Sequence, residues 1–431
     1  MMSFKIKMFA VFCFLFSVSC FSQETAETFF ELIKNKKVSE AYNLLEKQKE
    51  EGFTEKNFLL TWEKIRLSLG QLENYEKICN EESELGLVSY YKINFEKGDV
   101  VFRMHFNKDA ISGFFLVQTV PCDSKYSIPS YVDADSFIEE HILVEDQFEI
   151  TLTRSKNANA SNIICILLSG SGKQDKDATI GSNKPLKDLA LGLAAKGVSS
   201  IRFDKKPLDQ ISNYTVRDEY TGDVIKIVDY LKKSKEYCDF KIFVVGHSLG
   251  GMLAPTIASM EKKIKGAVLI GANFRPIEDL IMEQTEYLLS IDEKTPEENK
   301  KQYIDLLKSK IGYLKDSMGI DSDKRKLPFN IPASYWMSLE EYNLNNPKNR
   351  KKIKKPMLVL WGEKDYQVRE TDFNLYKKYF TKKKNEFKSY KNLNHILMLS
   401  NGTMGPSEYS STQRNIPEYV VDDLVGWLIG I

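Results

Sequence analysis

The stretch KIFVVGHSLGGMLA, residues 241–254, predicts the fold of the larger part of the chain. Its first five residues form a short run rich in Val, Ile and Phe, which is typical of a buried strand. Leu249 to Ala258 is typical of a helix. The turn between them holds Ser248 in a G-x-S-x-G pattern, in the strand–turn–helix context that the pattern requires. The stretch therefore predicts a serine exposed at the end of a strand.

Glycines surround Ser248 for a steric reason. A turn this tight has no room for a side chain on either flank, and Gly246 and Gly250 meet that need. Gly251 allows the following helix to pack closely. The first N–H groups of that helix are expected to face negative charge that develops beside the serine. We interpret Ser248 as a nucleophile, and the alternative is an ordinary glycine-rich turn.

A serine nucleophile needs a base, because its hydroxyl is hardly ionised at neutral pH. The chain has four histidines. His247 is expected to point elsewhere on the turn, His105 lies in the N-terminal region, and His141 precedes the predicted parallel strands. His395 remains, in a loop between the last predicted strand and the last predicted helix. Because such a loop lies at the same sheet edge as Ser248, we predict His395 as the base.

The base in turn needs a carboxylate that orients it and stabilises the imidazolium. Asp365 comes just after the predicted buried strand Pro356 to Trp361, at the same edge of the sheet. Glu363 is the competing acid, and we favour Asp365 because it lies deeper in the loop. The order Ser248, Asp365, His395 along the chain is that of the α/β-hydrolases.

Two backbone N–H groups are predicted to form the oxyanion hole. The first belongs to Leu249, directly after the nucleophile. The second is expected in the loop Ser169 to Asp175, where neighbouring glycines allow close approach, and Ser171 is the candidate. Asp175 and Asp177 are expected to brace this loop. The spacing of a phosphate-binding loop is absent, so nucleotide binding is not expected.

The domain organisation follows from a change of pattern along the chain. Residues 23–122 predict helices followed by three antiparallel strands, a small α+β domain, and residues 123–139 predict a linker. From 140 to 431 strands and helices alternate, which is typical of a mostly parallel sheet between helices. A helical, charged stretch at about 272–352 interrupts the alternation, and we interpret it as a lid insertion. In that stretch Tyr335 and Trp336 are expected to pack the lid on the core, the alternative being an acyl pocket.

Residues 1–22 predict a signal peptide. Two lysines precede the apolar run Met8 to Val18, which is too short to span a bilayer comfortably. Cleavage after Ser22 would leave Gln23 first, and the alternative is a lipid anchor on Cys20. We therefore expect an exported protein, periplasmic, at the cell surface or secreted, with no internal membrane span.

Composition excludes some classes of protein. The net charge is +1, from 61 basic and 60 acidic residues, so nothing favours nucleic acid as a partner. The six cysteines form no C-x-x-C pair, and we expect neither a metal nor an organic cofactor. In an exported protein a disulfide is plausible, with Cys79 and Cys122 as the first candidate pair. The oligomeric state is not predicted.

Residues 140–431 resemble the α/β-hydrolase superfamily, in its bacterial serine carboxylesterase and serine aminopeptidase-like branch. The segment LSGSGKQDKDATIGSNKPLKD, residues 168–188, is similar to the SGSG-x-QD-x-D…N-K-P segment of a carboxylesterase subgroup. The strand end Arg202 to Lys205 also resembles that subgroup, whereas Lys206 and Pro207 replace its Arg and Gly. Residues 25–120 resemble a domain of unknown function that is often fused before such hydrolases.

The resemblance implies an α/β-hydrolase fold with a helical lid. It also implies site residues, which are the triad Ser248, Asp365 and His395 and the oxyanion donors Ser171 and Leu249. The expected function is a serine hydrolase that cleaves small-molecule esters of small or medium acyl groups through an acyl-enzyme. We favour esters because we find no clear anionic subsite for a peptide terminus. The alternatives are an aminopeptidase or acyl-peptidase, and a binding protein whose hydrolase domain is secondary.

Overall fold

The computed structural model has two compact units, divided between Lys125 and Tyr126, and each is described by itself. The residues that the structure describes are 24–46, 54–83, 86–107, 110–117, 126–145, 148–157, 160–206, 208, 211–292, 295–317, 323–409 and 412–431. The predicted signal peptide, with Cys20 and Gln23, lies outside them. Cys79 is disulfide-bonded. Its predicted partner Cys122 lies outside the described residues, so this pairing stays a prediction.

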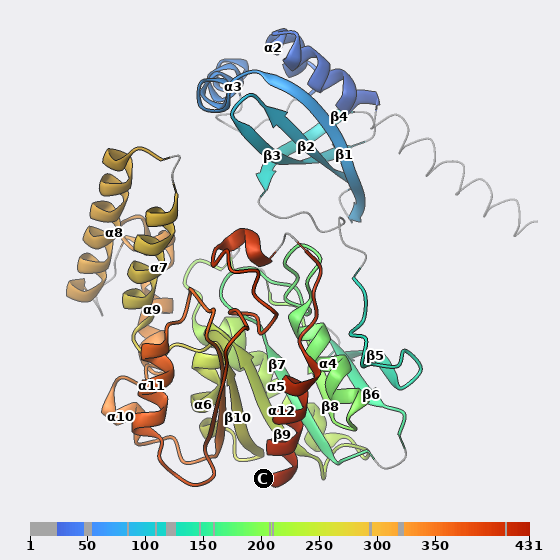
Figure 1. Ribbon diagram of the computed structural model, residues 1–431, viewed down its shortest axis with the longest axis vertical. Helices are drawn as coiled ribbons and strands as arrows, with labels where there is room; N and C mark the ends of the chain where they lie inside the picture. The colour runs from blue at the N-terminus through green and yellow to red at the C-terminus, as the bar shows by residue number, and fades with distance from the viewer. Residues whose placement is uncertain are drawn as a thin grey trace, which may run out of the picture. The chain divides into compact units, whose positions relative to one another are not determined.

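The N-terminal unit is an antiparallel sheet covered by helices (Figure 1). Its elements are a helix over 24–34, α2 (Val38–Tyr42), α3 (Glu55–Leu69), β1 (Leu72–Ser83), β2 (Gly86–Phe95), β3 (Gly98–Asn107) and β4 (Ala110–Val117). The strands lie in the order β1-β2-β3-β4, and aromatic side chains such as Phe29, Trp62 and Phe102 fill the core. We predicted three strands and missed β1, because its sequence, LENYEKICNEES, is mostly polar and has no clear apolar alternation.

The second unit is built on an eight-stranded sheet in the order β12-β11-β10-β9-β7-β8-β6-β5. Its strands are β5 (Phe137–Val144), β6 (Phe148–Ser155), β7 (Ile163–Leu168), β8 (Ser199–Arg202), β9 (Lys241–His247), β10 (Ile264–Ile270), β11 (Met357–Gly362) and β12 (Glu386–Tyr390). Six neighbouring strands are parallel, namely β12, β11, β10, β9, β7 and β8. The strand β6 pairs antiparallel with both β8 and β5. The mostly parallel sheet that we predicted is therefore present.

Helices cover both faces of this sheet (Figure 1). They are α4 (Pro185–Ala195), α5 (Gly222–Lys233) after a π-helical turn (Arg217–Thr221), α6 (Leu249–Met260), α11 (Glu370–Tyr379) and α12 (Glu418–Gly430). Alternate residues of β7 enter two separate cores: Ile164 and Ile166 pack with residues of α5 and α6, while Cys165 and Leu167 pack with residues of α4 and α12. Burial on both faces explains why this strand is continuously apolar.

The predicted insertion lies between β10 and β11, two neighbouring parallel strands. It contains α7 (Ile277–Ile291), α8 (Glu297–Ser317), two short 3₁₀ turns (Lys324–Lys326 and Pro328–Asn330), α9 (Ala333–Glu340) and α10 (Pro347–Arg350). Among the described helices of the whole chain, none is both long and apolar enough to cross a membrane.

The segment that we interpreted as a linker packs partly on the second unit. The Tyr126 hydroxyl donates to a carboxylate oxygen of Asp188 at 2.8 Å, and the Tyr131 hydroxyl donates to the carbonyl oxygen of Ile416 at 2.8 Å. These contacts extend the second unit upstream of residue 140. The sequence pattern marked this stretch only by its prolines and polar residues, and side-chain contacts with distant segments leave no local signal.

Candidate active site

Ser248 lies on a strained turn between β9 and α6. Its φ of 53° and ψ of −119° are unfavourable for a residue with a Cβ. A Cβ placed on Gly246 would lie 2.2 Å from the carbonyl oxygen of Gly250, and one on Gly250 would lie 2.5 Å from the carbonyl oxygen of Ser169. The prediction that this turn requires glycine on both flanks is confirmed. The serine is therefore held at the carboxyl end of a central strand, with α6 starting directly after it.

His395 and Asp365 form a buried pair at the same edge of the sheet. The Nδ1 atom of His395 lies 2.7 Å from Oδ2 of Asp365, and both residues are at most 3% exposed. The other carboxylate oxygen, Oδ1, accepts the backbone N–H groups of Gln367 and Val368. An ionised carboxylate only accepts hydrogen bonds, so Nδ1 carries the proton and Nε2 keeps its lone pair. This is the tautomer that a general base requires.

The competing acid, Glu363, is exposed and accepts a hydrogen bond from the Ser389 hydroxyl. The structure thus brings Asp365 to the histidine and leaves Glu363 at the surface.

The end of β10 lies close to both the serine turn and the histidine loop. The backbone N–H of Ser248 donates to the carbonyl oxygen of Ile270 at 2.8 Å. The next residue, Gly271, has a φ of 54°, and a Cβ there would lie 3.0 Å from Nδ1 of His395. This segment therefore joins the two loops that carry the candidate nucleophile and the candidate base.

His247 precedes Ser248 in the chain, and its ring contacts the loop of His395. We expected it to point elsewhere on the turn, and its ring centroid lies 4.6 Å from that of His395, with its Nε2 3.1 Å from the His395 carbonyl oxygen. Burial, and next the charge of His395, lower the pKa of His247 to about 3. His247 is therefore a neutral side chain that packs against His395, the candidate base. The contact with the His395 loop could not be predicted, because the sequence does not specify which way a side chain next to a strained residue points.

The loop after β7 lies against the serine turn. A Cβ on Gly170 would lie 3.2 Å from the Cβ of Ser248. Among the described residues, no hydrogen-bond acceptor is found for the N–H of Ser171. Leu249 is the first residue of α6, so its N–H has no acceptor within the helix. Both predicted oxyanion donors therefore have N–H groups available for a ligand.

The two aspartates of this loop have bracing contacts. Asp175 accepts the N–H and the hydroxyl of Thr179, at 2.8 and 2.6 Å. Asp177 is paired with Arg202 and with Lys184. These contacts agree with the structural role that we expected for both residues.

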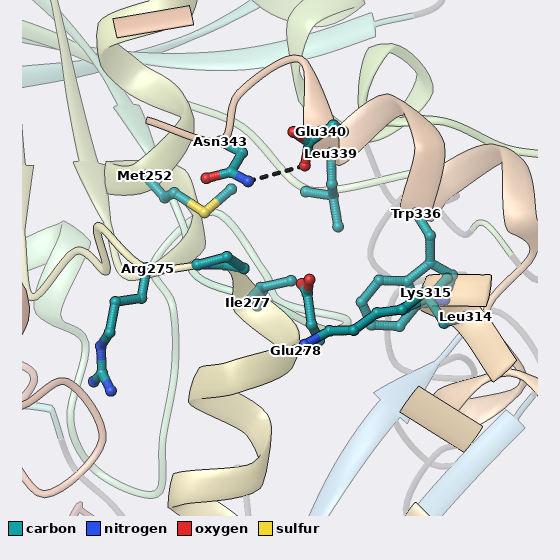
Figure 2. Close-up of a pocket in the computed structure, with 11 residues that line it drawn as sticks. Met252, Arg275, Ile277, Glu278, Leu314, Lys315, Trp336, Leu339, Glu340 and Asn343 are labelled. Atoms are coloured by element: carbon teal, nitrogen blue, oxygen red, sulfur yellow. Dashed lines mark hydrogen bonds between the residues drawn. The ribbon is translucent and has the colours of Figure 1, made fainter. Parts of the chain in front are cut away.

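A cavity of about 160 Å³ lies between helices of the insertion and α6 (Figure 2). Its lining residues come from α6, the start of α7, α8, α9 and the segments beside them, and they are Met252, Arg275, Pro276, Ile277, Glu278, Leu314, Lys315, Trp336, Leu339, Glu340 and Asn343. Ser248, Asp365 and His395 do not line it. Tyr335 and Trp336 both pack on the core, as expected, and Trp336 also lines this cavity; a role in an acyl pocket stays a prediction. Within the described part of the chain, no group of three or more His, Cys, Asp or Glu residues could hold a metal ion.

The sheet and the serine turn define the second unit as an α/β-hydrolase. In this fold the nucleophile stands on a strand-to-helix turn, and an oxyanion donor comes from the loop after the third strand, here β7. Residues 210–401 match the family described as "Serine aminopeptidase, S33". Residues 26–114 match a family described as a protein of unknown function, DUF3887. Part of the second unit is thus similar to the serine aminopeptidase family, and the first unit is similar to this domain of unknown function.

The chain is also similar to proteins that are named esterases. Esterase EstD of Thermotoga maritima is 28% identical over 418 residues, which cover 95% of each chain. Among solved structures, the Pyrococcus furiosus esterase Pf2001 is 16% identical, with a TM-score of 0.42 over 72% of this chain and 99% of the other. Est1E from Butyrivibrio proteoclasticus is 16% identical, with a TM-score of 0.42 over 68% of this chain and 99% of the other.

Proposed function

We propose that this protein is a serine hydrolase that cleaves carboxylic esters of small or medium acyl groups. The observation that carries the proposal is the buried hydrogen bond between His395 and Asp365, at the sheet edge where Ser248 stands on its strained turn. An unstrained serine or an exposed histidine would not by itself indicate an active site. Backbone strain and buried titratable pairs persist where the surrounding structure imposes them, and they cluster at active sites.

In the proposed reaction, Nε2 of His395 takes the proton of the Ser248 hydroxyl as the oxygen attacks the ester carbonyl. Asp365 stabilises the imidazolium that forms. The N–H groups of Ser171 and Leu249 hold the oxyanion of the tetrahedral intermediate. The intermediate then expels the alcohol, which receives the proton from His395, and an acyl-enzyme remains. Water attacks it by the same steps, releases the acid and restores the serine.

Three observations bear on the choice between ester and amide: the similarity to an esterase, the family description and the position of Glu278. The similarity to an esterase extends over 95% of the chain, which favours esters. The family description and Glu278 favour the alternative, an aminopeptidase, because a carboxylate in a cavity is the group that binds a peptide's ammonium end. Ser248, Asp365 and His395, however, are not among the residues that line this cavity, so nothing links Glu278 to the proposed site of cleavage. We therefore propose the ester.

Three substrates separate these activities. p-Nitrophenyl butyrate tests for an esterase, while alanyl-p-nitroanilide and propionyl-p-nitroanilide form a pair that differs only in the α-amino group. We expect turnover of the ester and no measurable turnover of either anilide, with all activity lost in Ser248→Ala. Cleavage of the alanyl anilide at a rate at least about 100-fold above that of the propionyl anilide would instead establish an aminopeptidase. A panel of p-nitrophenyl esters from acetate to octanoate then defines the acyl length.

We further propose that the protein is exported, on the N-terminal sequence pattern alone. Mass spectrometry of the protein purified from its natural host tests this. We expect a mature chain that starts at Gln23, and a chain that starts at a lipidated Cys20 would support the anchored form. A chain that retains residues 1–22 in the soluble cell fraction would contradict export.

A further inference from the structure

A buried polar network lies behind the loop that carries Ser171. Lys205 is 9% exposed, and its Nζ donates to the carbonyl oxygens of Gly170 at 2.6 Å and of Gly172 at 3.1 Å. The same Nζ donates to Oε1 of Glu219 at 2.6 Å. The sequence patterns did not indicate this network, although Lys205 is part of the segment that resembles other hydrolases.

Further side chains hold the same loop. The Tyr220 hydroxyl donates to the carbonyl oxygens of Gly170 at 2.7 Å and of Ser169 at 3.2 Å. The amide of Gln174 donates to the carbonyl oxygen of Ser171 at 3.2 Å. Four consecutive carbonyl groups, from 169 to 172, thus accept hydrogen bonds from side chains.

The geometry of the peptide bond links these contacts to the candidate oxyanion hole. In a trans peptide the C=O and the following N–H point in opposite directions, and the structure contains no cis peptide among its described residues. Lys205 and Tyr220 fix the Gly170 carbonyl, so they also fix the direction of the Ser171 N–H. Gly170 itself lies against Ser248. The network therefore aims the Ser171 N–H away from the buried lysine.

The network ends in the insertion. Tyr335, on α9, is 5% exposed, and its hydroxyl donates to Oε2 of Glu219, the carboxylate that pairs with Lys205. The next residue, Trp336, lines the cavity of Figure 2. A single helix of the insertion thus contacts both the cavity and the ion pair behind the loop.

We propose that Lys205, Glu219 and Tyr335 are positioning residues for the oxyanion hole, and that through them α9 of the insertion controls the orientation of the Ser171 N–H. This inference rests on the proposed function for its catalytic consequence. Burial lowers the pKa of Lys205, and the charge of Glu219 opposes that effect, so the carboxylate helps to keep the lysine charged. The Tyr335 hydroxyl in turn stabilises the charge of Glu219.

The test compares two tyrosines of the same region. Tyr342 is also buried, and its hydroxyl contacts Thr221 at 2.7 Å, with no contact to the ion pair among the described residues. Tyr335→Phe is expected to lower kcat on p-nitrophenyl butyrate roughly 3- to 10-fold and to leave KM within about twofold, while Tyr342→Phe leaves both unchanged. Lys205→Met is expected to lower kcat by about 100-fold, since loss of one oxyanion donor costs roughly 10²–10³ in rate.

Backbone amide hydrogen exchange over 168–176 gives a second readout that does not depend on activity. We expect faster exchange in Tyr335→Phe and Lys205→Met, and wild-type exchange in Tyr342→Phe. Wild-type kcat and wild-type exchange in Tyr335→Phe would overturn the inference, and so would equal losses in the two tyrosine variants. If Lys205→Met fails to fold, the comparison of Tyr335→Phe with Tyr342→Phe still tests the inference. If the wild type hydrolyses no ester, the proposed function fails, while the exchange comparison still tests the positioning role.

Discussion

Nδ1 of His395 lies 2.7 Å from the Asp365 carboxylate, and both side chains are buried. Two backbone N–H groups donate to the other oxygen of that carboxylate and fix its orientation. The hydrogen bond to Nδ1 then fixes the orientation of the His395 ring as well. The neighbouring acid, Glu363, lies only two positions away in the sequence but at the surface of the molecule. This contrast makes the two acids a matched pair for mutation.

Asp365→Asn is expected to lower kcat by about 10⁴-fold, because an amide in this position stabilises the wrong tautomer of His395 and leaves the imidazolium without a counter-charge. Glu363→Gln should keep kcat within about twofold of the wild type. Steady-state kinetics on p-nitrophenyl butyrate measures both. A large loss of kcat in Glu363→Gln, with little effect of Asp365→Asn, would show that Glu363 and not Asp365 is the acid.

The strain at Ser248 predicts a stability difference between two inactive variants. Ser248→Ala keeps the Cβ and its strain, whereas Ser248→Gly releases about 1–3 kcal/mol of backbone strain and loses about 0.5–1 kcal/mol through greater freedom of the unfolded chain. We expect the free energy of unfolding of the glycine variant to exceed that of the alanine variant by about 1 kcal/mol. Urea unfolding of the two proteins measures the difference. A glycine variant that is no more stable would mean that the turn is not strained.

His247 predicts a dependence of stability on pH. Its pKa in the folded protein is about 3, against a usual value of 6.5, because it is buried beside His395. Above pH 6.5 the side chain is neutral in both states and imposes no penalty. As the pH falls from 6.5 toward 3, the unfolded chain binds a proton that the folded protein does not, so stability is lost.

The matched variant is His247→Gln, which retains a side-chain N–H but does not titrate. Between pH 7.5 and 4.5 we expect the wild type to lose on the order of 2 kcal/mol more of its free energy of unfolding than this variant. Contributions from other groups are common to both proteins and cancel in the comparison. Parallel curves of stability against pH would show that His247 is accessible to protons in the folded state.

The contacts of Tyr126 and Tyr131 predict where the second unit can be separated. A chain that starts at residue 126 keeps both hydrogen bonds, while one that starts at 137 loses them and leaves Asp188 with fewer partners. Burial already raises the pKa of Asp188 to about 6, so the loss of a donor is costly. We expect the free energy of unfolding of the shorter chain to be lower by about 2 kcal/mol, so that it unfolds at a lower urea concentration. Equal midpoints would restore the interpretation of this stretch as a linker.

Much of the fold and the candidate site could be predicted because the signals are local. The buried strand before Ser248, the glycines around it and the strand before Asp365 each follow from sterics or burial within a few residues. Parallel topology then brings strand ends to one edge, which is why His395 could be expected near Asp365, the contact that the structure contains.

What could not be predicted depends on contacts between distant segments. Strand β1 gains its place from pairing with β2 rather than from its own pattern. The ring of His247 is oriented by a loop about 150 positions away, and Glu219 meets Tyr335 over a similar separation. Side-chain direction and long-range hydrogen bonding are determined by packing, which has no periodic signature in the sequence.

The central claim is that Ser248 becomes acylated. The most direct measurement is intact-protein and peptide mass spectrometry after reaction with a fluorophosphonate, with Ser248→Ala as the control. We predict one adduct on the wild type, located on the peptide that contains Ser248, and none on the variant. An adduct on both proteins, or on a different residue of the wild type, would contradict the assignment of the nucleophile and the mechanism built on it.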